Sequence, residues 1–113
     1  MDLLLKNKVI PVTGGAKGIG EGIVRSLANE GAIPVIVGRN QDDNLRLLKD
    51  LSEISPSATQ ITAELTDPEH CRMVVDQLIK TYGRIDGLVN NAGVNDGVGL
   101  ERGDYASFMS ESK

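Results

Sequence analysis

The stretch Thr13-Gly-Gly-Ala-Lys-Gly-Ile-Gly20 follows directly on the apolar run Val9-Ile-Pro-Val12. Three of its glycines stand at a spacing of four and then two, with a lysine between the first two of them. A helical pattern of apolar residues begins near Gly18, so the stretch is a turn between a strand and a helix. The unpaired N–H groups of a helix N-terminus suit a pyrophosphate, and glycines let its oxygens reach the backbone. We interpret the stretch as a phosphate-binding turn; the alternative is a strand-to-helix turn that binds no ligand.

The rest of the chain alternates between strand and helix patterns. Helices of this length between strands require right-handed crossovers and therefore a parallel sheet. This order predicts an α/β fold, a Rossmann-type doubly wound parallel sheet that ends after the fourth strand. Pro11 falls in the middle of the central strand, where it cannot donate a ladder hydrogen bond. The predicted strands are Lys8–Thr13, Ile33–Gly38, Thr59–Leu65 and Ile85–Gly93, and the predicted helices run from about Gly18 to Gly31, from Asp42 to Ser52 and from Thr66 to Tyr82.

Each of the three predicted helices has an apolar face. The second helix should bury a leucine stripe, and the third helix should place Cys71 in the core. The third helix also has the clearest start signal, because Thr66-Asp67-Pro68-Glu69 offers a cap, an early proline and a capping-box acid. The predicted leucine stripe consists of Leu45, Leu47, Leu48 and Leu51.

Composition limits the classes of function. The 113 residues form one small domain, residues 1–113, with 40% hydrophobic and 25% charged residues. A net charge of −4 and only three aromatic residues argue against a nucleic-acid surface. No run approaches the roughly 20 apolar residues of a membrane span, and no secretory signal opens the chain. The single cysteine can form neither an internal disulfide nor a metal cluster, so a reducing, cytoplasmic setting is expected.

A second motif, Asn90-Asn91-Ala92-Gly93, follows the fourth predicted strand. The glycine spacing T-G-x-x-x-G-x-G is neither G-x-G-x-x-G nor the phosphate-binding P-loop pattern. With both motifs intact, the sequence resembles the N-terminal half of a short-chain dehydrogenase/reductase, from Leu5 to about Leu100. The segments MDLLLKNKV and RIDGLVNNAGVNDGVGL are also similar to bacterial L-fucose and deoxy-sugar acid dehydrogenases.

This resemblance implies a site for a nicotinamide dinucleotide. The glycine turn would hold the cofactor phosphates, and Glu64 would take the position that receives the adenine amine, where the family usually has aspartate. The backbone N–H of Leu65 would contact the adenine, and Asn90 with the turn after it would line the ribose. Asn90 and Asn91 could also simply pin strand ends, and both roles can coexist. The implied cofactor-binding residues are Gly14, Gly15, Ala16, Lys17, Gly18, Ile19, Gly20, Arg39, Glu64, Leu65, Asn90, Ala92 and Gly93.

The second strand ends in Gly38-Arg39, about twenty residues past the glycine turn. A fold specific for NAD normally has a carboxylate there, which binds the ribose 2′-hydroxyl. Glycine removes the side chain, and the guanidinium of Arg39 suits a 2′-phosphate, with Lys17 as a second cation. NADP is therefore favoured, while Asp42 and Asp43 leave NAD open. Alternatively, both cations are solvated surface charges.

The catalytic residues that the family uses are a serine, a tyrosine and a lysine four residues after that tyrosine. Tyr82 is followed four residues later by Asp86, and Tyr105 by Met109, so no catalytic residue is named. We expect the cofactor-binding half of an NAD(P)-dependent oxidoreductase that acts on a sugar or other secondary alcohol, inactive by itself. The alternative is a complete, non-catalytic nucleotide-binding or assembly module. Self-association is expected through the strand edge Asp86–Gly93.

Overall fold

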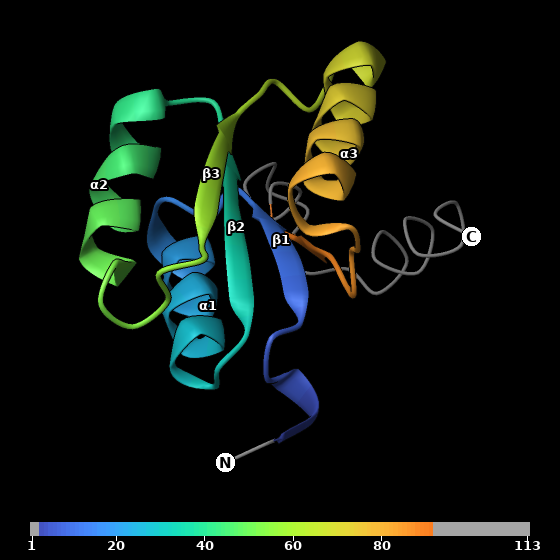
Figure 1. The fold of residues 1–113 in the computed structure, drawn as a ribbon. Helices are drawn as coiled ribbons and strands as arrows, with labels where there is room; N and C mark the ends of the chain where they lie inside the picture. The colour runs from blue at the N-terminus through green and yellow to red at the C-terminus, as the bar shows by residue number, and fades with distance from the viewer. Residues whose placement is uncertain (1–2, 92–113) are drawn as a thin grey trace.

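Four parallel strands form one sheet in the order β3-β2-β1-β4. The computed structural model describes residues 3–91. Helices cover both faces of this sheet (Figure 1), so the predicted α/β, Rossmann-type arrangement is confirmed. The elements in chain order are η1 (Leu3–Leu5), β1 (Val9–Thr13), α1 (Gly18–Asn29), β2 (Ile33–Gly38), α2 (Gln41–Leu51), β3 (Thr59–Thr62), α3 (Pro68–Tyr82) and β4 (Val89–Asn90).

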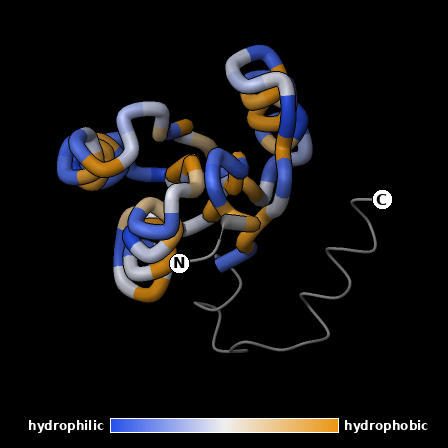
Figure 2. The backbone as a smooth tube through the Cα atoms, turned by 60° about the horizontal axis from the view of Figure 1, so that its bottom comes forward, coloured by the Kyte–Doolittle hydropathy of each residue, from blue (hydrophilic) through white to orange (hydrophobic). Residues whose placement is uncertain are grey.

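The helix ends follow from local sequence signals. Asn40 caps α2 by accepting a hydrogen bond from the backbone N–H of Asp43. Asp67 caps α3 in the same way, Pro68 occupies its first turn, and Gly83 ends it with a φ of 77°. The predicted cap and early proline of α3 are therefore confirmed, with Asp67 as the capping residue. The predicted capping-box role of Glu69 is wrong, because Glu69 stands two residues after the cap and not three. Hydrophilic and hydrophobic residues alternate along the turns of α1, α2 and α3 (Figure 2).

Pro11 is buried in β1 opposite Val35 of β2, in spite of its missing N–H. In a strand, the N–H groups of neighbouring residues point to opposite edges, and those of residues two apart point to the same edge. Gly14 donates toward β2, whereas Val9, two residues before Pro11, donates toward the segment before β4. The ring nitrogen of Pro11 therefore faces β4, and the pairing of β1 with β4 begins only at Val12. The proline costs no ladder hydrogen bond at this position.

The α1 and α2 side of the sheet holds a buried cluster to which β1 and β2 contribute. One predicted member of the α2 stripe is wrong, because Leu45 is 44% exposed. Asn44 is 0% exposed and takes the buried position instead, one turn before Leu47 and two turns before Leu51. The buried cluster consists of Val12, Val24, Ala28, Ile36, Leu47 and Leu51.

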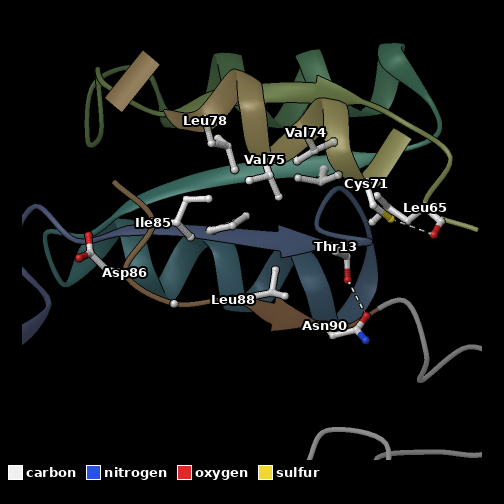
Figure 3. Close-up of a pocket in the computed structure, with 13 residues that line it drawn as sticks. Thr13, Leu65, Cys71, Val74, Val75, Leu78, Ile85, Asp86, Leu88 and Asn90 are labelled. Atoms are coloured by element: carbon white, nitrogen blue, oxygen red, sulfur yellow. Dashed lines mark hydrogen bonds between the residues drawn. The ribbon is translucent and has the colours of Figure 1, made fainter. Parts of the chain in front are cut away.

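The α3 side is covered less completely. A groove of about 620 Å³ lies between α3 and the segment that leads to β4, and apolar side chains line most of it (Figure 3). Cys71 lies at this groove and is exposed, so its predicted burial is wrong. Its thiol donates a 3.4 Å hydrogen bond to the carbonyl of Leu65.

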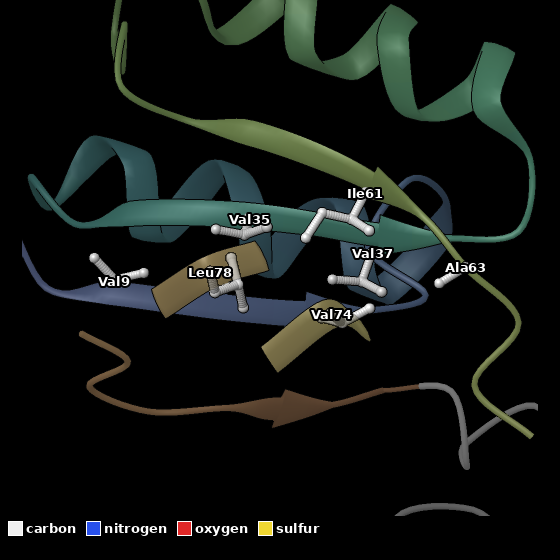
Figure 4. Packing of buried hydrophobic residues seen from close by; sticks show 7 residues of the cluster. All are labelled: Val9, Val35, Val37, Ile61, Ala63, Val74 and Leu78. Atoms are coloured by element: carbon white, nitrogen blue, oxygen red, sulfur yellow. The ribbon is translucent and has the colours of Figure 1, made fainter. Parts of the chain in front are cut away.

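The second buried cluster lies between α3 and the sheet (Figure 4). It joins two residues of the helix to residues of the three strands β1, β2 and β3 and the residue just after β3. Its members are Val9, Val35, Val37, Ile61, Ala63, Val74 and Leu78.

β3 and β4 are shorter than predicted by several residues, and β1 begins at Val9 and not at Lys8. β3 ends at Thr62, opposite the last residue of β2, and the N–H of Ala63 makes a final bond to the carbonyl of Gly38 at 3.1 Å. The N–H of Glu64 then donates to the Nδ1 atom of His70, 2.9 Å away.

Before β4, the carboxylate of Asp86 accepts from the backbone N–H of Val9 at 2.8 Å. The hydrogen bonds from Arg84, and then the one from Val9, lower the pKa of Asp86. The backbone N–H of Asp86 also donates to the carbonyl of Val9 at 2.9 Å. Both bonds anchor this segment to the start of β1, and regular pairing with β1 is confined to Val89–Asn90.

Within residues 3–91, β4 lies at one edge of the sheet. The expected association of two chains through the edge Asp86–Gly93 stays a prediction, and the last two residues of that edge lie outside the described part of the chain.

Candidate functional site

A crevice of about 360 Å³ lies at the carboxyl ends of the strands, where the glycine turn meets the end of β2. β1 stands between β2 and β4, so the strand order changes direction at this point. Open α/β sheets bind ligands at such a switch point. The lining residues come from the ends of three strands and from the turns and helix starts that follow two of them. Gly14, Ala16 and Lys17 lie in the turn after β1, and Gly18 and Ile19 begin α1. Gly38 ends β2, Arg39 and Asn40 follow it, Asp43 and Asn44 lie in the first turns of α2, and Asn91 follows β4.

The glycines of the turn have different physical roles. A Cβ atom on Gly20 would overlap the carbonyl oxygen of Gly14 and lie 2.8 Å from the Nδ2 atom of Asn91. Gly15 is also confined by the protein itself, since a Cβ there would lie 2.9 Å from the carbonyl oxygen of Val12. Gly18 differs, because its φ is 56° and no protein atom lies within 4 Å of the place of a Cβ. The turn is thus closely packed at Gly15 and Gly20, and the space beside Gly18 is open.

The N-terminus of α1 opens into this space without a side-chain cap. Lys17 stands at the N-cap in an extended conformation and makes no capping hydrogen bond. α2 and α3, in contrast, are capped by Asn40 and Asp67. The first N–H groups of a helix need a partner, and their partial positive charge favours an anion. Glu21 is the one acidic residue in the first turn of α1.

The end of β2 brings charges of both signs to the crevice. The Nζ atom of Lys17 lies 3.1 Å from the carboxylate of Asp43, whose side chain is only 11% exposed. Arg46 approaches the same carboxylate at 3.3 Å. Arg39 lies 3.7 Å from Glu64, and its side chain is 79% exposed. Such a long, exposed ion pair contributes little stability, so Arg39 can leave it at low cost.

The two asparagines after β4 point to different places. Asn90 accepts a hydrogen bond from the Thr13 hydroxyl at 3.0 Å and lines the apolar groove (Figure 3). Asn91 donates to the carbonyl of Gly14 at 3.2 Å and lines the crevice. Both side chains therefore pin the end of β4 to the end of β1. The other two predicted residues of this motif, Ala92 and Gly93, lie outside the described residues.

The remaining predicted residues lie beside the crevice. Glu64 reaches it only through Arg39, and Leu65 lines the apolar groove. The loop that carries both is held by His70, whose Nδ1 atom accepts the backbone N–H of Glu64.

Five of the lining residues are not among the cofactor-binding residues implied by the sequence, namely Gly38, Asn40, Asp43, Asn44 and Asn91. Asn40 had the usual signal of an N-cap between a strand and a helix. Asn44 had the spacing of the buried stripe that ends in Leu47 and Leu51. In the part of the chain that the structure describes, no three metal-binding side chains gather, and no helix has the length and apolarity needed to cross a membrane.

Comparison with known proteins identifies relatives over most of the chain. The family model for short chain dehydrogenases matches residues 8–111. 11-beta-hydroxysteroid dehydrogenase A of Sesamum indicum is 38% identical over 92 residues, which are 77% of this chain and 25% of that protein. L-fucose dehydrogenase of Bos taurus is 37% identical over 86 residues, 76% of this chain and 30% of that protein. The chain therefore spans about a quarter to a third of these relatives, and L-fucose dehydrogenase is one of several activities among them.

Solved structures share the fold. Cj0485 dehydrogenase superposes with a TM-score of 0.74 at 38% identity, covering 97% of this chain and 42% of that one. L-sorbose reductase from Gluconobacter frateurii, in complex with NADPH and L-sorbose, gives 0.73 at 32% identity, covering 77% and 34%. NAD⁺-bound xylitol dehydrogenase gives 0.69 at 26% identity, covering 74% and 32%.

Proposed function

Because the chain belongs to the short chain dehydrogenase family, we propose that its crevice binds the nicotinamide dinucleotide of an alcohol dehydrogenase or carbonyl reductase. The strongest support for this proposal is that the N-terminus of α1, which has no side-chain cap, opens into the crevice beside Gly18. An anion there would accept from helix N–H groups that lack a side-chain partner. When bound, the nicotinamide group exchanges a hydride with a carbonyl or an alcohol.

The chain's own residues would bind and orient this cofactor. The backbone from Gly14 to Ile19 would surround the pyrophosphate, and Asn91 would hold the turn in shape through the Gly14 carbonyl. The described residues fit the group, because the space beside Gly18 is one that no side chain of the protein fills. We propose that Glu64 lies toward the adenine end, since it already pairs with Arg39 at the crevice.

NADP is the proposed preference. The last residue of β2 is Gly38, so no carboxylate is available there for the ribose hydroxyls. Arg39 is exposed and its ion pair with Glu64 is long, so it is free to turn toward a 2′-phosphate. Lys17 is tied more closely to Asp43, and we assign it the smaller share of phosphate binding.

We propose a secondary alcohol, or the matching carbonyl compound, as the substrate. The names of L-fucose dehydrogenase and L-sorbose reductase support a sugar as the substrate. The 11-beta-hydroxysteroid dehydrogenase is about as similar in sequence, and its name supports secondary alcohols in general. Neither Tyr82 nor Tyr105 is followed by a lysine four residues later, so we assign to residues 1–113 the binding of the cofactor and not the proton transfer.

Replacing Arg39 by alanine should lower the affinity for NADP about tenfold or more and leave the affinity for NAD nearly unchanged. A hydrogen bond to a charged group contributes about 1.5–3 kcal/mol, and about 1.4 kcal/mol corresponds to a factor of ten. Isothermal titration of the 113-residue chain with each nucleotide measures both affinities. Arg72→Ala is the matched control, because it removes the same charge from a 67% exposed side chain, and neither Arg72 nor its partner Glu69 lines the crevice. Tighter binding of NAD than of NADP by the unmodified chain would overturn the preference.

A further inference from the structure

Gly38, the last residue of β2, is a glycine whose backbone does not require one. The glycines with positive φ are Gly14, Gly18, Gly31 and Gly83, and Gly38 is not among them. Its conformation is therefore open to any residue, and the reason for glycine must be the space around its Cα atom.

That space is closed by Asn44 of α2. A Cβ atom on Gly38 would lie 2.6 Å from the Oδ1 atom of Asn44 and 3.5 Å from its Cγ atom. Since Cβ atoms in proteins essentially never approach an oxygen below 3.0 Å, one of the two residues would have to move.

Asn44 has no room to move. Its side chain is 0% exposed, and its Nδ2 group donates to the carbonyl of Gly38 at 3.1 Å and to the Oε1 atom of Gln60 at 3.0 Å. Reversing the amide would set its oxygen against those two acceptors, so the orientation is fixed. Its Oδ1 atom is left buried, without a hydrogen-bond partner among the described residues, directly against Gly38. A buried amide oxygen without a partner destabilises the fold, and the two donated bonds keep it in place.

We propose that Asn44 is a specificity-determining residue for the cofactor, because it restricts position 38 to a residue without a side chain. Asn44 thereby prevents an aspartate or glutamate at position 38, whose carboxylate would bind the ribose hydroxyls of NAD. Arg39 is then the side chain that contacts the ribose or its 2′-phosphate. This inference rests on the proposed function, since it concerns the choice between two cofactors of the same crevice.

The steric part of the inference is tested without any nucleotide. Gly38→Ala should lower the thermal midpoint of unfolding of the 113-residue chain by about 4 °C or more. In a chain that already carries Asn44→Ala or Asn44→Ser, adding Gly38→Ala should lower this midpoint by less than about 2 °C. Asn44→Ser keeps a hydroxyl donor and serves if the alanine variant does not fold. Gly22→Ala is the matched control, since nothing lies within 4 Å of a Cβ there, and its effect should be the same in all backgrounds. An equal loss from Gly38→Ala with and without Asn44 would overturn the inference.

The specificity part is tested by titration with NAD and NADP. Gly38→Asp combined with Asn44→Ser should shift the ratio of the two affinities toward NAD by about tenfold or more, because the new carboxylate then has room to accept from the ribose hydroxyls. Gly38→Asp alone should not produce this shift. An equal shift in the single variant would overturn the role of Asn44. If the unmodified chain binds neither nucleotide, the proposed function and the specificity role both fail, while the thermal coupling still reports on the packing of Asn44 against Gly38.

Discussion

Replacing Gly20 by alanine is expected to destabilise the protein by about 3 kcal/mol or more, enough to unfold a marginally stable domain. The added Cβ atom would overlap the carbonyl oxygen of Gly14, which is a backbone atom of the glycine turn itself. The same Cβ would lie 2.8 Å from the Nδ2 atom of Asn91, which holds the turn to β4. Chemical denaturation followed by circular dichroism measures the loss.

The control for this variant lies two residues further along the same helix. Gly22 of α1 has no atom within 4 Å of the place of a Cβ, so Gly22→Ala adds the same atom without a contact. Alanine in a helix interior is more favourable than glycine by about 0.5–1 kcal/mol, and this variant should be as stable as the parent or more so. Equal stability of the two variants would show that α1 does not pack against the turn as described.

Truncation of Leu51 should lower the free energy of unfolding by about 2–5 kcal/mol. Its side chain is 0% exposed and lies in the cluster between α2 and the sheet, so alanine would leave a cavity. Leu45→Ala is the matched control on the same helix, because Leu45 is 44% exposed. A surface substitution of this kind usually changes stability by no more than about 0.5 kcal/mol. Urea unfolding of both variants measures the difference, and a larger loss at Leu45 would contradict the face of α2 that the structure buries.

The sequence predicted most elements because their signals are local. β2 runs from Ile33 to Gly38 as expected, and α3 begins at the predicted cap and ends at Tyr82. Asn44 was missed because its burial depends on partners that are distant in sequence, the carbonyl of Gly38 and the side chain of Gln60. A polar residue in a leucine-rich helix carries no local sign of such partners, so Leu45 was placed on the buried face in its stead.

The candidate site was predicted in part for a similar reason. The glycine turn is contiguous in sequence, and its residues come together around the N-terminus of α1. The resemblance assigned Asn90, and not Asn91, to the ribose, but neighbouring residues of a strand point to opposite sides and the sequence carries no local sign of which one faces the crevice. In the structure Asn91 lines it, and Asn90 bonds to Thr13 beside the apolar groove.

A nuclear magnetic resonance titration of the 113-residue chain with NADP, followed through the backbone amides, tests directly whether the crevice binds the cofactor. The largest shifts are expected at the amides of Gly18, Ile19 and Gly20, where α1 begins without a side-chain cap, and at the amide of Arg39. Amides beside the apolar groove, such as those of Val75 and Leu78, should change little. Saturable shifts confined to that groove, or no shifts at millimolar NADP, would contradict the proposal that this crevice holds the cofactor.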